Sequence, residues 1–492
     1  MIAPRKLAIW IHRWMGVGCC ALFVMWFASG IVLMYCDYPL VHAEERLARA
    51  AAIDASRIQL SPEQAFAKLE ASEAPDRVWI TMLDARPAYR FGFRDAQVIM
   101  YADSGEVLDS VSRELGLRIA AAWTGQSRSS AQASQSTEVD QWTVYPGIWR
   151  GQPLWKYSWA NGEEVYVSQE SAEVVQYSTR GARIGAYFGA IPHWLYFTPL
   201  RANNPAWRKA VIGLSGLGTL TTIFGLTIGV WLYSPSKPRS IPYQGQTRWH
   251  MILGLVFGLF AFTWVLSGML SISPFDWNSD DTAEGPAKAL RGGQWSAEAF
   301  AAENPRDALA KVAGDMKVKE LELATVLGEP VYFAVEAPER SRVIPMHGSP
   351  STEFDVDRIL RTMAEAGPGA LAEAHRMDAY DRYYIDRHHR KPLPVLLVRF
   401  DDRNQSVYYV DLKTAQVVES YDARSRVNRW LYHGLHSIDL PWLYRNRPAW
   451  DIAVLTLMLG GVALSVTSVV IGWRRLRKKV RRFRSAKFAP AR

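Results

Sequence analysis

Four long apolar stretches constrain what this chain can fold into more than any other feature of its sequence. They cover residues 14–35, 210–233, 251–273 and 452–473, and none of them contains Asp, Glu, Lys, Arg or His. A bilayer has a hydrocarbon core of about 30 Å, which a helix rising 1.5 Å per residue crosses in roughly 20 residues. The sequence therefore predicts four transmembrane helices that share the 492-residue chain with two long polar segments.

Basic residues cluster at one end of these stretches. They lie before the first stretch, between the second and the third, and after the fourth, where ten Lys or Arg fall between 474 and 492. The positive-inside rule then predicts that both termini and the short middle loop are cytoplasmic, and that the two long loops lie outside. This flanking pattern accounts for the net charge of +9, so we exclude nucleic acid as a partner.

The three cysteines, Cys19, Cys20 and Cys36, lie in or directly after the first apolar stretch. They cannot form a disulfide framework for the polar segments. The first stretch shows no small-residue cleavage site, which predicts a retained helix rather than a removed signal peptide.

Each long loop is predicted to form a small α+β domain. The first opens a helix with the capping box Ser61–Gln64, and its Ser/Gln-rich stretch 124–137 is typical of a flexible linker, as is 285–293 more weakly in the second. Neither loop contains a catalytic triad or a glycine-rich phosphate loop. In the first half of the chain, the predicted divisions are the N-terminus with helix 1 (1–36), outer domain 1 (37–182), an interfacial helix with helix 2 (183–233) and a cytoplasmic loop (234–248). In the second half they are helix 3 (249–273), outer domain 2 (274–425), an interfacial helix with helix 4 (426–473) and a basic tail (474–492).

The chain contains an internal duplication that two gapless alignments reveal. At an offset of 238 residues the matches are His12, Gly16, Trp26, Ser29 and Gly30 with His250, Gly254, Trp264, Ser267 and Gly268. At an offset of 243 they include Tyr166, Arg183, His193, Asn203, Pro205 and Trp207 with Tyr409, Arg426, His436, Asn446, Pro448 and Trp450. Both copies begin in the cytoplasm, so the pattern predicts parallel repeats related by a pseudo-twofold axis along the membrane normal.

Four of the ten histidines form two repeat-matched pairs, His12 with His250 and His193 with His436. Residues related by a twofold axis can meet on it, so each pair can supply two axial imidazoles to one haem iron. The pairs lie at opposite ends of the spans, which predicts one haem near each membrane face. Without a CxxCH motif these would be noncovalent haems b.

A structural role for the same histidines stays open, because a duplication preserves any histidine whatever it did before. His433 is an alternative ligand three residues from His436, and His388 and His389 belong either to a solvated basic loop or to a transient metal contact. Trp26, Trp264, Gly16 and Gly254 fit helix packing as well as cofactor contact. Four arginines fit either haem propionates or topology flanks; they are Arg13, Arg201, Arg248 and Arg445.

Three stretches make the sequence resemble the PepSY-associated transmembrane family of bacterial inner-membrane proteins, which includes ferri-siderophore reductases. They are Ile11–Gly16, the strand-turn-strand runs Tyr101–Val107 and Tyr409–Val418, and Arg429–His436. The resemblance implies a di-haem helical core with His12, His193, His250 and His436 as ligands, and two PepSY-like domains in the periplasm. The first-loop counterpart of the run Tyr409–Val418 departs from the pattern, because it has Ser168 where the motif has Asp.

The sequence thus predicts a membrane α-helical protein of four helices in two parallel repeats, with two periplasmic α+β domains. Its expected function is to carry electrons from an unidentified cytoplasmic or membrane donor through two haems b to a ferric chelate. Ferric siderophores are the favoured substrates, and no catalytic acid or base is required. The alternative is a haem-free, membrane-anchored PepSY protein that binds a peptide or regulates a protease. A secondary transporter is disfavoured because the spans lack polar coupling residues.

Overall fold

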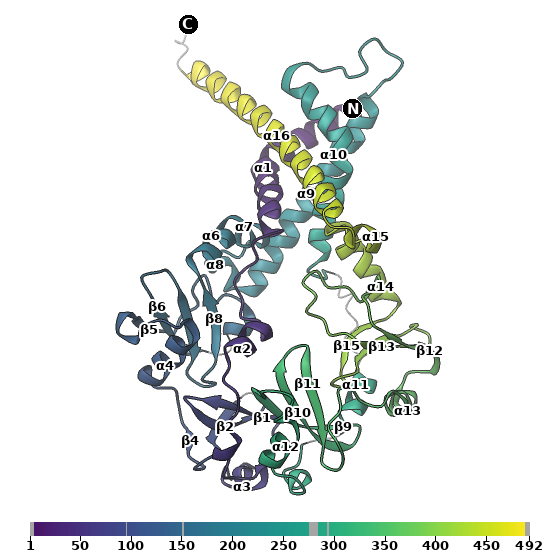
Figure 1. Ribbon diagram of the computed structural model, residues 1–492. Coiled ribbons are helices and arrows are strands. Elements are labelled where there is room, and N and C mark those ends of the chain that lie inside the picture. The colour runs from purple at the N-terminus through teal and green to yellow at the C-terminus, as the bar shows by residue number, and fades with distance from the viewer. Residues whose placement is uncertain (1–3, 95, 150–151, 275–283, 293–294, 488–492) are drawn as a thin grey trace. The chain divides into compact units, whose positions relative to one another are not determined.

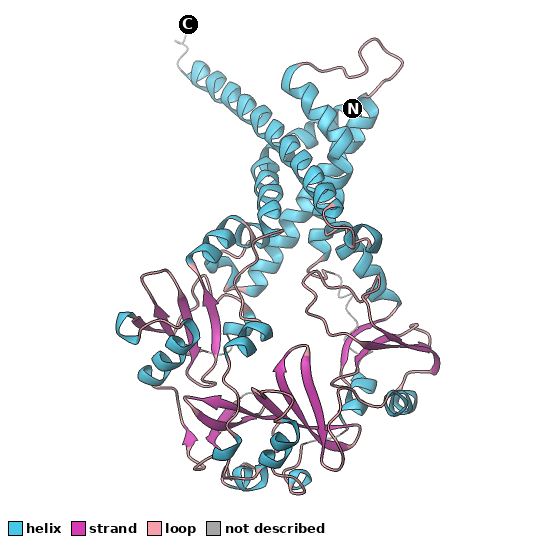
Figure 2. Cartoon of the chain, viewed as in Figure 1, coloured by secondary structure: helices cyan, strands magenta, loops and turns pink. Residues whose placement is uncertain are grey.

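The computed structural model describes residues 4–94, 96–149, 152–274, 284–292 and 295–487 (Figure 1 and Figure 2). The chain divides into two compact units. The helical unit comprises Met1–Tyr38, Gly181–Trp277 and Val427–Arg492, and the outer unit comprises Pro39–Arg180 and Asn278–Arg426.

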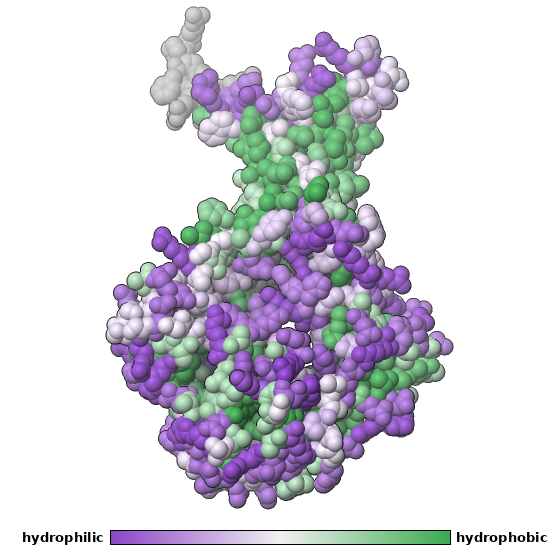
Figure 3. All heavy atoms as spheres, viewed as in Figure 1, coloured by the Kyte–Doolittle hydropathy of each residue, from purple (hydrophilic) through white to green (hydrophobic). Residues whose placement is uncertain are grey.

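Four long apolar helices build the helical unit and are long enough to cross a membrane: α1 (Pro4–Leu33), α9 (Asn204–Leu232), α10 (Gly245–Leu270) and α16 (Ala449–Lys487). The four predicted spans are therefore confirmed as membrane-spanning candidates. Helix α1 packs against α9 and α16, and α10 packs against the same two helices. Apolar residues gather over these helices in Figure 3, as expected for a surface that faces lipid.

All four helices are longer than the apolar stretches that predicted them, and two of them extend ten residues or more beyond one end. Helix α1 begins ten residues before 14, and α16 continues through the basic segment to Lys487. The first part of the predicted basic tail is thus helical. Arg and Lys are good helix formers and the segment contains neither Gly nor Pro, so nothing in it ends the helix at the edge of the apolar stretch.

Short helices join the outer unit to the second and fourth spans. The first junction contains α6 (Arg180–Phe188), α7 (Ala190–Trp194) and α8 (Thr198–Arg201), and the second contains α14 (Ala423–Arg429), a π-helical turn (Trp430–Gly434) and α15 (Pro441–Tyr444). The two junctions turn at matched positions, because Leu195 (φ 54°) and Ile438 (φ 50°) are both left-handed. Each is followed within a few residues by a short helix that begins with proline in its first turn.

The outer unit contains three sheets. A seven-stranded antiparallel sheet has the order β11-β10-β9-β1-β2-β3-β4, and its strands are β1 (Arg77–Leu83), β2 (Arg86–Gly92), β3 (Gln97–Tyr101), β4 (Val107–Leu108), β9 (Glu320–Val326), β10 (Glu329–Ala337) and β11 (Arg340–Pro345). Both long loops contribute to this sheet, because β1 pairs with β9. Ile80 and Leu321 face each other across that pair and are fully buried. The two loops therefore share one hydrophobic core.

The other two sheets are four-stranded meanders, one from each loop. They are β5 (Gln132–Ser136), β6 (Leu154–Ser158), β7 (Glu164–Ser168) and β8 (Val174–Ser178), and β12 (Ala370–Met377), β13 (Val395–Asp401), β14 (Val407–Asp411) and β15 (Val417–Tyr421). Their third and fourth strands share a register shift at matched positions, Tyr166/Val167 and Tyr409/Val410. The interpretation of 124–137 as a linker is wrong, because Gln132–Ser136 pairs along its whole length with β6. Its polar composition fits an edge strand, which carries polar side chains without needing a buried face.

Helices cover these sheets. They are α2 (Ala43–Arg49), α3 (Pro62–Ala67), α4 (Arg113–Thr124), α5 (Pro146–Trp149), α11 (Glu284–Arg291), α12 (Pro305–Val312) and α13 (Val356–Ala366). The predicted capping box is confirmed at the start of α3. The Ser61 hydroxyl accepts a hydrogen bond from the Gln64 amide, and the Gln64 side chain accepts one from the Ser61 amide.

Candidate functional site

His12 of α1 and His250 of α10 face each other inside the helical unit. Their ring centres are 6.3 Å apart and their planes differ by 30°. The sequence placed the two residues 238 positions apart, and the helix packing brings them together because α1 and α10 both pack against α9 and α16. A metal ion held between two imidazole nitrogens at about 2 Å each would separate the ring centres by roughly 6 Å. The separation of this pair fits that arrangement.

His12 and His250 form the inner pair, and the Nδ1 atom of each already has a hydrogen-bond partner. His12 Nδ1 lies 3.0 Å from the Thr221 carbonyl oxygen, which can only accept, so Nδ1 carries the proton. His250 Nδ1 lies 3.1 Å from the Thr467 hydroxyl and 3.3 Å from that of Ser468. Both hydroxyls donate to the Leu464 carbonyl and therefore accept from the ring. In this tautomer the lone pair is on Nε2, the nitrogen that remains for a ligand, as in metal-binding histidines generally.

A cavity of about 260 Å³ contains both inner histidines in its lining. The lining is mostly apolar, with Gly16 and Gly254 among its members. A Cβ atom added at Gly16 would meet no atom within 4 Å, so the space beside this glycine is open. A flat, largely apolar molecule is the kind of ligand that such a cavity accommodates.

His193 and His436 form the second pair, with ring centres 6.1 Å apart and planes at 63°. His193 is in the short helix α7, and His436 follows the π-helical turn Trp430–Gly434. Helix α7 packs against α1, and the π-helical turn packs against α10. His193 and His436, the outer pair, therefore lie on segments that pack against the same two helices that carry the inner pair.

A serine and a glycine from α1 and α10 seat the outer histidines. Ser29 Oγ lies 3.3 Å from His193 Nδ1, and Ser267 Oγ lies 3.0 Å from His436 Nδ1. Each hydroxyl donates to a backbone carbonyl of its own helix and so accepts from the imidazole. The neighbouring Gly30 leaves room for the ring, because a Cβ there would lie 3.2 Å from His193 Cε1.

Burial keeps the outer pair neutral. It lowers the pKa of His193 to about 4, with a smaller contribution from the neighbouring His436, and lowers the pKa of His436 to about 4. Neutral imidazole is the form that ligates a metal. At pH 7 both rings therefore have an unprotonated nitrogen available.

The two pairs lie at opposite ends of the spans. His12 and Ser29 are 17 residues apart in α1, and His250 and Ser267 are 17 apart in α10, which at 1.5 Å per residue is about 26 Å of helix. That distance is close to the thickness of the hydrocarbon core, which is about 30 Å.

Aromatic side chains pack between the two pairs. Phe23 stacks with Phe27 at 6.3 Å, and Phe27 meets the edge of Trp264 at 5.8 Å. Trp26 belongs to the same cluster and supplies the backbone carbonyl that lies 3.2 Å from His193 Nδ1. Both tryptophans therefore have packing contacts here, as one of the two interpretations of the sequence predicts.

Of the other candidate histidines, His433 lies beside the outer pair, whereas His388 and His389 lie in the outer unit. The His433 ring lies 4.5 Å from that of Tyr432, with the two planes tilted by 48°, and the Tyr432 ring lies 5.6 Å from that of His436. His388 and His389 are exposed in the outer unit, where the Asp386 carboxylate organises their loop by accepting the amides of His388, Arg390 and Lys391. Among the residues that the structure describes, no three His, Cys, Asp or Glu side chains gather as a metal site.

The four arginines that were candidates for carboxylate contacts differ in position. Arg13 lines the inner cavity with His12. Arg201 is buried, its guanidinium lies over Trp207 at 4.5 Å, and it donates to Asn204. Arg248 and Arg445 are exposed and do not line the cavity.

Several residues at this site were missed by sequence reasoning. Ser29 and Ser267 are matched in the repeat alignment, which by itself assigns them no role. The recurrence of a hydroxyl and a histidine at the same spacing in both copies is the signal that could have identified them. Thr221, Thr467 and Arg475 carry no local pattern that would single them out. Their roles arise only from the packing of α9 and α16 against the helices that carry the histidines.

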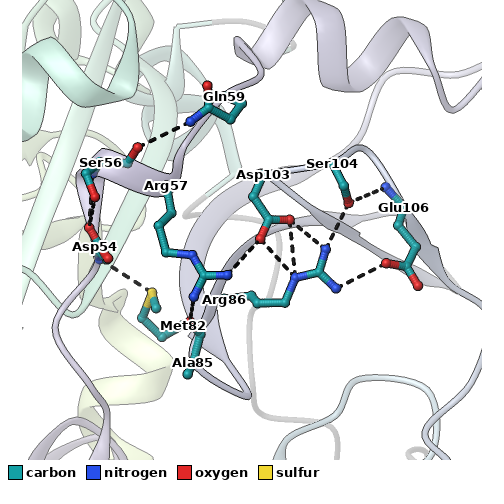
Figure 4. A network of polar contacts seen from close by, with 10 residues as sticks. All are labelled: Asp54, Ser56, Arg57, Gln59, Met82, Ala85, Arg86, Asp103, Ser104 and Glu106. Carbon is teal, nitrogen blue, oxygen red and sulfur yellow. Dashed lines mark hydrogen bonds and ion pairs between the residues drawn. The ribbon is translucent and has the colours of Figure 1, made fainter.

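The strand-turn-strand motif of the outer unit has a structural explanation. After β3, Asp103 accepts from Arg86 of β2 at 2.6 and 2.9 Å and from Arg57 at 3.2 Å (Figure 4). This network pins the turn to the neighbouring strand.

The departure at Ser168 is also explained. Its hydroxyl accepts the amides of Glu170 and Ser171, and in the other meander Asp411 accepts the amide of Lys413 at 3.0 Å. Serine and aspartate therefore stabilise the same kind of turn at the two matched positions.

Fold and site together define a class of protein: a polytopic membrane protein with paired histidines at both ends of a four-helix unit, attached to an outer unit of antiparallel sheets. The chain belongs to the family described as PepSY-associated TM region, whose sequence pattern matches residues 9–337. The match covers the first three spans and the shared seven-stranded sheet except its outermost strand, β11. No curated protein matches the chain.

Proposed function

We propose that this protein is a di-haem b membrane cytochrome that moves electrons from the cytoplasmic side to the periplasm of a bacterial inner membrane and reduces ferric chelates there. His12 and His250 would hold one haem, and His193 and His436 the other. The observation that carries the proposal is that the two histidines of each repeat-matched pair lie close together, with ring centres 6.3 and 6.1 Å apart.

The donor set fits the group. Two neutral imidazoles meet the needs of a low-spin haem iron without any charged ligand, and the four apolar stretches contain no carboxylate. All four Nδ1 atoms have a hydrogen-bond acceptor, which fixes the tautomer and orientation of each ring. A structural role for the histidines would not require all four rings to leave the same nitrogen available.

Each haem, when bound, supplies a one-electron Fe(III)/Fe(II) couple. The chain itself holds the two sites about 26 Å apart along two continuous helices. It also fills the space between them with the apolar cluster that includes Phe23, Phe27 and Trp264, which excludes water. A dry, fixed spacing is what electron transfer across a membrane requires of its protein.

The topology sets the direction. The basic flanks favour cytoplasmic termini, which puts the inner pair at the cytoplasmic face and the outer pair near the periplasm. The substrate gains one electron and passes from a ferric to a ferrous chelate. Oxygen-rich chelators prefer hard Fe(III), so this reduction loosens the metal without breaking the ligand. Ferric siderophores are the favoured substrates, and an unidentified cytoplasmic or membrane-bound reductant is the electron donor.

The proposal includes two parallel repeats with a pseudo-twofold axis. Matched backbone features support it: the register shifts of the meanders, the left-handed Leu195 and Ile438, and the equivalent seating of His193 and His436 by Ser29 and Ser267. An axis of this kind places both histidine pairs on the centre line of the helical unit.

The first experiment is the visible spectrum of the detergent-purified full chain, oxidised and dithionite-reduced, with haem quantified per chain. We expect two haems b in the wild type and one in each of His12→Ala and His436→Ala. His433→Ala is the matched control and should keep both haems. A chain that remains colourless when haem is supplied would overturn the proposal and favour the haem-free PepSY binding protein.

A second experiment tests the direction of transfer. The chain is reconstituted into liposomes with dithionite-reduced electron mediator inside and a ferric hydroxamate chelate outside, and ferrous iron is trapped outside by a chromogenic chelator. We expect colour only with the wild type, and none with either histidine variant.

A further inference from the structure

The inner cavity is built from two matched halves. Its lining residues in α1 and α10 correspond at an offset of 238, and those in α9 and α16 at an offset of 243. Every lining residue has its repeat mate in the lining except Phe27, Leu226 and Tyr243. A ligand in this cavity therefore meets nearly the same surroundings on both sides, and any difference between the halves decides how it is oriented.

Charge is the main difference between the halves. Arg13 and Arg475 line the cavity, whereas their repeat mates are Met251 and Leu232, which line it on the other side. Arg13 is in α1 and Arg475 in α16, which pack together, and Leu232 and Met251 are in α9 and α10, which also pack together. One edge of the cavity thus has two cations, and the opposite edge is apolar.

The two guanidinium groups lack a compensating anion. Within the described part of the chain, the cavity lining includes no Asp or Glu, and neither arginine has an ion pair with a carboxylate. Arg13 is exposed to solvent and Arg475 is half-buried, so the two charges are tolerated without an anion, and their donors are available to an anionic ligand that enters the cavity.

We propose that Arg13 and Arg475 form a carboxylate clamp that fixes the orientation of the inner haem. The clamp takes the edge of a planar ligand that carries two carboxylates, the propionates of haem b, and Leu232 and Met251 receive the opposite, apolar edge. This inference rests on the proposed function and deepens it. It adds Arg475 to the site and assigns one of the two possible orientations in a nearly symmetric cavity.

The test compares two iron porphyrins in chain produced without haem: Fe(III) mesoporphyrin and its dimethyl ester, which lacks the carboxylates. Wild-type chain should bind the free acid at the inner site at least tenfold more tightly, as expected when charge-assisted hydrogen bonds are lost. Arg13→Gln with Arg475→Gln should remove this preference and lower the loading of haem b from two per chain towards one.

Two arginines serve as matched controls. Arg474 precedes Arg475, Arg248 lies two residues before His250, and both are exposed and outside the lining. Arg248→Gln with Arg474→Gln removes the same charge from the same membrane face and should leave haem loading and the preference unchanged. An equal loss in this control would assign the effect to general surface charge and overturn the clamp.

A charge-relocation variant provides a readout that does not depend on affinity. Arg13→Met, Met251→Arg, Leu232→Arg and Arg475→Leu exchange the two edges without changing composition. The haem should then bind in the opposite orientation, which changes the pattern of paramagnetically shifted haem methyl signals and the sign of the Soret circular dichroism. An unchanged pattern would overturn the assignment.

The outcomes separate this inference from the proposed function. Wild-type chain without haem would refute both. Suppose that the wild type and the Arg13/Arg475 variant both contain two haems, and that the wild type binds the porphyrin acid and its ester with equal affinity. This result would refute only the clamp. Retained haem with loss of reduction from the cytoplasmic side would assign the arginines to the electron donor and also refute the clamp.

Discussion

The two histidine pairs are alike in separation but differ in how the fold holds them. The inner histidines are part of α1 and α10, and their Nδ1 partners come from α9 and α16. The outer histidines lie in short junction segments, and their Nδ1 partners come from α1 and α10. Helices α1 and α10 thus carry one pair and seat the other. The spacing of the two sites is set by two continuous helices rather than by the loops.

The largest expected effect is the loss of one site without the other. His250→Ala should abolish the six-coordinate inner haem, because a single imidazole leaves the iron five-coordinate at most and more weakly held, and His193→Ala should abolish the outer one. The remaining haem in each variant should keep its absorption bands. Haem per chain and the reduced spectrum measure this directly.

Loss of both haems from a single variant would contradict the comparison. It would mean that the pairs are coupled through the helices they share rather than seated independently. The double variant His193→Ala with His250→Ala should contain none.

The next largest effect concerns the hydroxyl groups that seat the outer pair. Ser29→Ala with Ser267→Ala should weaken the outer haem by roughly 10- to 100-fold and leave the inner haem unchanged, because outer-shell partners of metal-binding histidines have effects of this size. Haem dissociation followed by transfer to a scavenging apoprotein measures both sites.

The inner pair offers a matched control. Thr467→Val with Ser468→Ala removes the hydroxyls beside His250, whereas His12 is held by the Thr221 carbonyl, which no side-chain replacement deletes. This control should weaken the inner haem only. A loss of the outer haem in the control would refute the assignment of partners.

Much of this architecture could be predicted from the sequence, because the features involved are local or periodic. Length and the absence of charge identify the spans, and the capping residues at Ser61 and Gln64 identify α3. The pairing of His12 with His250 followed from two copies of one motif. A duplication turns a long-range contact into a pattern that is visible along the chain.

Other features depend on contacts that leave no local signal. The pairing of β1 with β9 joins segments 243 residues apart, and although this offset makes the two strands repeat mates, no turn or local motif shows that they pair with each other. The strand at Gln132–Ser136 lacks the apolar alternation that marks a strand, because it lies at the edge of its sheet. The role of Arg475 depends on where the last turns of α16 pass α1, which the composition of a basic tail does not indicate.

A smaller effect should distinguish the glycines beside the two pairs. A Cβ at Gly225 would lie 2.8 Å from His12 Cε1, whereas one at Gly268 would lie 3.6 Å from His436 Cε1, an ordinary contact. Gly225→Ala must displace the ring, and overpacking of this kind costs about 1–3 kcal/mol, which at its lower end is roughly a tenfold loss of inner haem affinity. Gly268→Ala is the control and should be near neutral. Equal effects of the two variants would show that both rings adjust freely.

Asp103→Asn, a variant of the outer unit, should leave both haems unchanged. It tests whether the outer histidine pair depends on the outer unit. Hydrogen bonds from Arg86 lower the pKa of Asp103 below its usual value. The carboxylate therefore stabilises the fold at neutral pH, and this contribution disappears as pH falls through the lowered pKa.

Asp103→Asn should therefore reduce the stability of the outer unit at pH 7 by about 1–2 kcal/mol, since the ion pair is partly exposed. The difference from wild type should vanish in acid. Urea unfolding of the full chain in detergent, followed by tryptophan fluorescence at both pH values, measures it. Haem content at pH 7 should stay at two per chain, because Ser29 and Ser267, and not the sheet around Asp103, hold the outer histidines. A parallel loss of the outer haem would show that the folded outer unit is needed to keep the junction helices on α1 and α10.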